Sequence, residues 1–96
     1  MNKQQYLLIK LMEECGEVIQ TCSKALVFGL DDKHPKNEGR CNTENLNYEL
    51  NDLVTIIDML KETGIPLSMK SELKKNKREK VLKYVEYSKK KGILNE

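Results

Sequence analysis

Two long segments of the chain carry apolar residues at helical spacing, and this pattern constrains the fold more than any other feature. Projected at about 100° per residue, each segment gathers its apolar side chains into one arc. The first arc contains Leu8, Leu11, Met12, Cys15, Val18, Ile19, Cys22, Ala25 and Leu26, and the second contains Leu46, Leu50, Leu53, Val54, Ile56, Ile57 and Leu60. Two amphipathic helices must cover each other's apolar faces, so we expect an all-α antiparallel helix bundle.

The ends of these helices follow from local signals. The first helix should run over residues 4–28 and stop at Gly29, and the second should run over residues 43–63 with Thr43 as its N-cap. A third helical stretch, over about residues 68–91, should cover part of the apolar face. Between the first two helices, residues 29–42 are rich in turn-forming residues, and this loop is long enough to cover a ligand.

Each of the first two helices also carries a pair of carboxylates three residues apart. The pairs are Glu14 with Glu17 and Glu49 with Asp52. A spacing of three places both members on one side of a helix, about one turn apart. Glu14 and Glu49 fall at the border of the apolar arcs, where an unpaired carboxylate is costly to desolvate, whereas Glu13 points away toward the surface.

Antiparallel packing would bring the four carboxylates together. Four anions in one place repel one another unless a cation joins them, and oxygen-only ligands are what Mg²⁺ prefers. The sequence therefore predicts a Mg²⁺ site at Glu14, Glu17, Glu49 and Asp52, with Mn²⁺ as a substitute. For any single pair, the alternative is a solvated helix face.

The segments around these acids resemble the MazG-like branch of the all-α nucleoside triphosphate pyrophosphatases. The resemblance covers roughly residues 5–62 and rests on four segments: Glu13-Glu14-Cys15-Gly16-Glu17, Ser23-Lys24-Ala25-Leu26, Phe28-Gly29 and Glu49-Leu50-Asn51-Asp52-Leu53. It departs from the compact members in the long stretch between the two acid pairs, residues 18–48. The resemblance implies that the four carboxylates bind Mg²⁺, which holds the triphosphate of a nucleotide.

The activity so implied is hydrolysis of a nucleoside triphosphate, ribo or deoxyribo, to the monophosphate and pyrophosphate. Water activated by the metal would attack phosphorus, and Glu17 or Glu49 would take its proton. Five other side chains are candidates for binding the substrate. They are Lys24, beside Glu17 on the first helix, Lys36 and Arg40 in the loop, and Asn45 and Asn51, which flank the second pair.

Size and composition fit one small domain that oligomerises. Ninety-six residues bury a limited core, so we expect a homodimer or homotetramer, as the resemblance also implies. No apolar run is long enough to span a membrane and no signal peptide is recognisable, so a cytoplasmic location is expected.

Cys15 and Cys22 lie on the apolar arc and should be reduced core thiols, while a zinc site joining the cysteines to His34 is a minor alternative.

Charge is divided unevenly along the chain and leaves other functions open. Residues 1–66 carry a net charge of −4 and residues 67–96 a net charge of +6. The basic tail could serve a non-enzymatic helical module that binds nucleic acid or protein, although interleaved glutamates and the lack of stacking aromatics make nucleic acid an unlikely partner. Phosphoribosyl-ATP pyrophosphatase, from the same superfamily, is the enzymatic alternative. A ferritin-like di-iron site is excluded because it needs a Glu-x-x-His motif.

Overall fold

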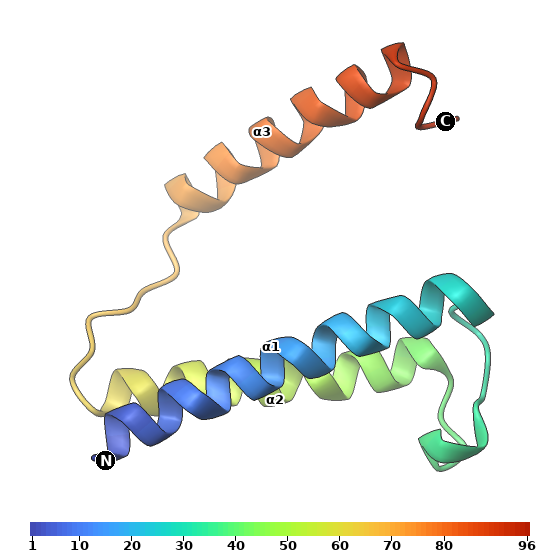
Figure 1. The fold of residues 1–96 in the computed structure, drawn as a ribbon. Helices are drawn as coiled ribbons and strands as arrows, with labels where there is room; N and C mark the ends of the chain where they lie inside the picture. The colour runs from blue at the N-terminus through green and yellow to red at the C-terminus, as the bar shows by residue number, and fades with distance from the viewer.

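The computed structural model describes all 96 residues as an all-α chain without strands, which confirms the predicted fold class. Helix α1 spans Lys3–Phe28 and helix α2 spans Asn42–Glu62; the short 3-10 helix η1, Pro35–Asn37, lies in the loop between them. Helix α3 spans Ser71–Lys90. Figure 1 shows α1 and α2 side by side as an antiparallel hairpin, with α3 standing apart at the end of an extended connection.

The seam between α1 and α2 is the best-packed part of the chain. Leu7 and Leu60 are its two buried apolar side chains, with exposed fractions of 4% and 0%. At the open end of the hairpin, Gln4 Nε2 donates a hydrogen bond of 3.0 Å to the Thr63 carbonyl and fixes the register. On α1 the covered positions recur every three or four residues, as one helical stripe requires: Leu7, Leu11, Glu14, Val18, Thr21 and Ala25.

The helix ends differ slightly from the sequence prediction, for reasons that the hydrogen bonds explain. Helix α1 starts at the capping box of Asn2 with Gln5. The N-cap of α2 is Cys41 rather than Thr43, because the Thr43 hydroxyl donates to the Leu30 carbonyl at 3.2 Å and holds the loop instead. Helix α3 begins three residues later than predicted, since the chain is extended up to Lys70, and it is continuous.

Buried asparagines fasten the loop between the first two helices. Asn42 Nδ2 donates to the Gly29 carbonyl at 2.8 Å, and its Oδ1 accepts from Asn37 Nδ2 at 3.1 Å. Both asparagine side chains are almost fully buried. Because buried amides without partners are costly, these bonds hold the two ends of the loop together and give it a defined conformation.

Two thirds of the apolar arc predicted for the first helix is exposed in this chain. Six α1 residues form an exposed line, named here the apolar stripe: Leu8, Met12, Cys15, Ile19, Cys22 and Leu26. The prediction that Cys15 and Cys22 are core thiols is therefore wrong for the single chain, in which both are free and exposed. The reason is geometric, because one neighbouring helix covers only one side of a wide apolar arc.

Helix α3 does not cover this face, contrary to the prediction. None of its residues is buried, and only α1 and α2 pack closely together. The radius of gyration is 16.9 Å, whereas a compact domain of this length has about 12.5 Å. The chain alone thus leaves much of its apolar surface uncovered. No helix in it is both long enough and apolar enough to cross a membrane.

Candidate metal centre

Four carboxylates converge at the middle of the hairpin, as the sequence predicted. Glu14 and Glu17 come from α1, and Glu49 and Asp52 come from α2. One carboxylate oxygen from each residue lies within 4.8 Å of the corresponding oxygens of the other three. A divalent cation placed among them would find oxygen ligands from both helices, which is the donor set that Mg²⁺ and Mn²⁺ accept.

The helix pairing gives the four carboxylates two different environments. Glu14 and Glu49 lie in the seam and are half-buried, whereas Glu17 and Asp52 lie at its exposed edge. The Oε2 atoms of Glu14 and Glu49 are buried and have no hydrogen-bond partner. Buried carboxylate oxygens without partners are costly, so these two atoms identify a position that a cation would stabilise.

The pKa values of the seam carboxylates reflect the same crowding. The neighbouring Glu17 carboxylate, with partial burial and the charge of Asp52, raises the pKa of Glu49 from 4.5 to about 7. Partial burial, followed by the charge of Glu17, also raises the pKa of Glu14. Without a cation the cluster therefore holds a proton at a pH where isolated glutamates are ionised.

No basic side chain neutralises the four acids. The ion pairs of the chain lie elsewhere on its surface, and one of them joins Lys10 to Glu13 at 3.1 Å. Glu13 thus points away from the cluster, as its helical phase predicted. The four carboxylates are also the only group of three or more potential metal ligands, so the alternative zinc site with His34 does not form.

The predicted substrate-binding residues are only partly brought together. Arg40 and Asn45 meet directly, with Arg40 Nη2 donating to Asn45 Oδ1 at 3.2 Å. Lys24 is half-buried on α1, two turns beyond Glu17 and on the same side. Lys36 is exposed in η1, with no side-chain bond, and Asn51 donates to the Asn47 carbonyl at 2.7 Å on the far side of α2.

Sequence reasoning missed one residue of this region, Tyr48. The Arg40 guanidinium lies over its ring, 4.4 Å from the ring centroid. Tyr48 is four residues before Asp52, so the two side chains share one face of α2, and this spacing was the signal available in the sequence. On the side of the acid cluster nearest the loop, Arg40 therefore contacts both Asn45 and the Tyr48 ring.

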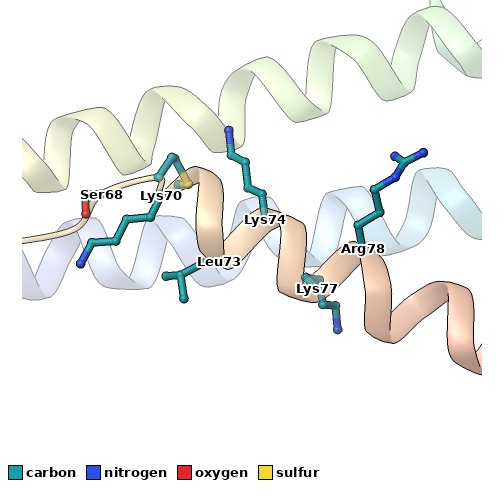
Figure 2. Close-up of a pocket in the computed structure, with 7 residues that line it drawn as sticks. Ser68, Lys70, Leu73, Lys74, Lys77 and Arg78 are labelled. Atoms are coloured by element: carbon teal, nitrogen blue, oxygen red, sulfur yellow. The ribbon is translucent and has the colours of Figure 1, made fainter.

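Two concave regions lie outside the acid cluster. A cavity of about 570 Å³ is lined only by apolar residues next to the loop: Cys22, Ala25, Leu26, Leu30 and Leu46. Another, of about 430 Å³, lies along the first turns of α3 and includes Lys70, Lys74, Lys77 and Arg78. Figure 2 shows that these basic side chains spread outward in different directions rather than converging on one point.

Comparisons with protein-family models, with curated proteins and with solved structures give no match to this chain. The function of the chain is therefore inferred from the geometry of the site.

Proposed function

We propose that the protein is a Mg²⁺-dependent nucleoside triphosphate pyrophosphohydrolase. One observation carries the proposal: four carboxylates from two helices lie within 4.8 Å of one another, and no basic residue pairs with them. Two of their oxygens are buried and lack partners. Such a cluster is destabilising by itself and becomes favourable when a divalent cation and an anionic substrate share it.

In this proposal all four carboxylates bind the metal, and two of them also accept a proton. Glu14, Glu17, Glu49 and Asp52 would hold Mg²⁺ or Mn²⁺, and the bound ion would neutralise phosphate charge and make water more acidic. Glu17, which lies at the exposed edge, would receive the proton of the attacking water on a carboxylate oxygen, with Glu49 as the alternative acceptor. Lys24 lies two turns along the same side of α1, where it can attract the phosphates.

The proposal includes self-association in the cytoplasm. The residues of the apolar stripe follow one another at alternating intervals of four and three, the spacing of a helix-packing seam, and Met12, Ile19 and Leu26 are 72%, 69% and 88% exposed. A second copy of the chain could cover this line and form a homodimer or homotetramer. Three free cysteines fit a reducing compartment.

A second candidate function rests on α3. This helix is solvent-exposed and belongs to the segment with a net charge of +6, as expected of a module that binds a polyanion. The divergence of its basic side chains in Figure 2 favours diffuse attraction over one specific site.

Phosphoribosyl-ATP pyrophosphatase is an enzymatic alternative that would use the same acid cluster, so a substrate panel must include that nucleotide.

The test is pyrophosphate release from a panel of ribo- and deoxyribonucleoside triphosphates and phosphoribosyl-ATP, with and without Mg²⁺. We expect Mg²⁺-dependent release that falls by about 10- to 100-fold or more in Asp52→Asn, because one ligand of the metal is lost. Asp58→Asn is the matched control, since Asp58 is on the same helix but pairs with Lys61 at the surface. No release from any nucleotide, together with salt-sensitive binding of nucleic acid that needs no Mg²⁺, would favour the α3 module.

A further inference from the structure

The loop that precedes α2 is built to place the side chain of Arg40. Glu38 and Gly39 both adopt left-handed backbone conformations, with φ of 54° and 83°. A left-handed glutamate is uncommon and carries some strain, so the surrounding structure must hold it in place. The buried pair of Asn37 and Asn42 supplies that support on either side of the turn. As a result Arg40 is directed back over the first turns of α2.

The guanidinium of Arg40 makes one hydrogen bond and one longer ionic contact within the chain. Nη2 donates to Asn45 Oδ1 at 3.2 Å, Nη1 lies 3.7 Å from a carboxylate oxygen of Glu38, and the buried Nε has no hydrogen-bond partner. The Glu38 carboxylate also offsets the positive charge locally. The guanidinium also lies over the Tyr48 ring, with its carbon 4.4 Å from the ring centroid. Arg40 thus acts on Tyr48 by stacking and limits the rotation of its ring.

Tyr48 in turn is held at a defined distance from the acid cluster. It lies one helical turn from Asp52, about 6 Å along the axis of α2 at 1.5 Å per residue. Its side chain is 56% exposed, so the covering by Arg40 still leaves aromatic surface free. The base of a nucleotide must lie several ångströms from the metal that holds its triphosphate. The Tyr48 ring is an exposed aromatic surface at about that distance from the acid cluster.

We propose that Tyr48, held by Arg40, is the surface on which the nucleobase of the substrate stacks. The proposal rests on the proposed pyrophosphohydrolase function and names the part of the site that distinguishes a nucleotide from a bare triphosphate. Asn45 lies next to the pair, and while its Oδ1 accepts from Arg40, its Nδ2 is free to donate a hydrogen bond to the edge of a base. Stacking of this kind accepts all bases, because every base has a π-face.

The experiment compares two probes by calorimetry in Mg²⁺. One probe is the α,β-methylene analogue of a nucleoside triphosphate, which cannot be cleaved at that bond, and the other is inorganic tripolyphosphate, which has no base. We expect Tyr48→Leu to weaken nucleotide binding by about 10-fold or more and tripolyphosphate binding by less than about 2-fold. Tyr48→Phe should bind both probes like the native chain, because the ring is retained.

The matched control is Tyr87→Leu, since Tyr87 is 57% exposed and has Lys91 over its ring, but lies on α3. Circular dichroism checks that each variant folds. The proposal is overturned if Tyr48→Leu leaves nucleotide binding unchanged, or if it weakens both probes equally. If the native chain binds neither probe in Mg²⁺, the proposed function itself fails, and that result is distinguishable because it does not depend on any variant.

Discussion

Replacing Glu49 by glutamine should stabilise the metal-free protein, which is an unusual outcome for a half-buried polar residue. The pKa of Glu49 is raised to about 7, mainly by Glu17. A raised carboxylate pKa means that the folded chain binds a proton more tightly than the unfolded chain. Stability without metal should therefore be greatest below pH 4.5 for this group, fall as pH rises, and reach its lower limit above about pH 7.

The magnitude follows from the size of that change. Raising the pKa from 4.5 to about 7 corresponds to roughly 3 kcal/mol at about 1.4 kcal/mol per pKa unit. Because Glu49 is only half-buried, solvent screening reduces this to about 1–2 kcal/mol. Glutamine keeps the shape of the side chain and removes the charge. At pH 8 without metal, Glu49→Gln should therefore melt several degrees higher than the native chain, at about 4–8 °C per kcal/mol.

The assay is thermal unfolding followed by circular dichroism at one fixed protein concentration, at pH 5 and pH 8, with and without Mg²⁺. At 100 times its dissociation constant, Mg²⁺ should stabilise the native chain by about 2.7 kcal/mol, and Glu49→Gln should lose most of this gain. Glu62→Gln, an exposed change on the same helix, should show neither effect. If Glu49→Gln is less stable than the native chain at pH 8 without metal, the account of the cluster as mutually repelling charges is wrong.

Three further substitutions test the fold around the site. Leu60→Ala should lower the free energy of unfolding by about 2–5 kcal/mol in urea, because Leu60 is fully buried, and a loss no larger than that of the half-exposed Leu50→Ala would contradict the described seam. Asn42→Ala should cost about 1–3 kcal/mol by leaving buried polar groups of the loop unpaired, and an unchanged urea midpoint would count against that network. Ile19→Lys should reduce the mass measured by analytical ultracentrifugation while Gln20→Lys should not, and equal masses would show that the apolar stripe does not mediate self-association.

Local rules place each carboxylate pair at the border of its apolar arc, and antiparallel packing of the two helices then brings the pairs together. A spacing of three fixes the side of the helix on which two carboxylates lie, and the apolar arcs fix which sides of the two helices meet. Glu14 and Glu49 therefore had to enter the seam whatever the exact register of the hairpin. The position of Glu13 at the surface followed from the same helical phase.

Other features depended on contacts that no local pattern records. The width of an apolar arc does not say how much of it a neighbouring helix covers, so Cys15 and Cys22 were placed in a core that this chain alone does not form. The contact between Arg40 and Tyr48 follows a turn in which Glu38 has a left-handed backbone conformation. The sequence did not predict this conformation at Glu38, because the neighbouring Gly39 is the residue expected to adopt it. Tertiary bonding also decided the N-cap of α2, since Thr43 bonds to the loop.

The most direct test of the account is to locate a bound divalent cation in the folded chain. Mn²⁺, which is paramagnetic, can replace Mg²⁺ and broadens the NMR signals of nearby nuclei. We expect that, at low Mn²⁺, broadening appears first at residues 14–17 of α1 and 49–52 of α2, and that Mg²⁺ reverses it. Broadening that appears first at Asp31, Asp32 or α3, or that persists unchanged in a variant with Glu14→Gln and Asp52→Asn, would contradict the central claim that these four carboxylates form the metal site.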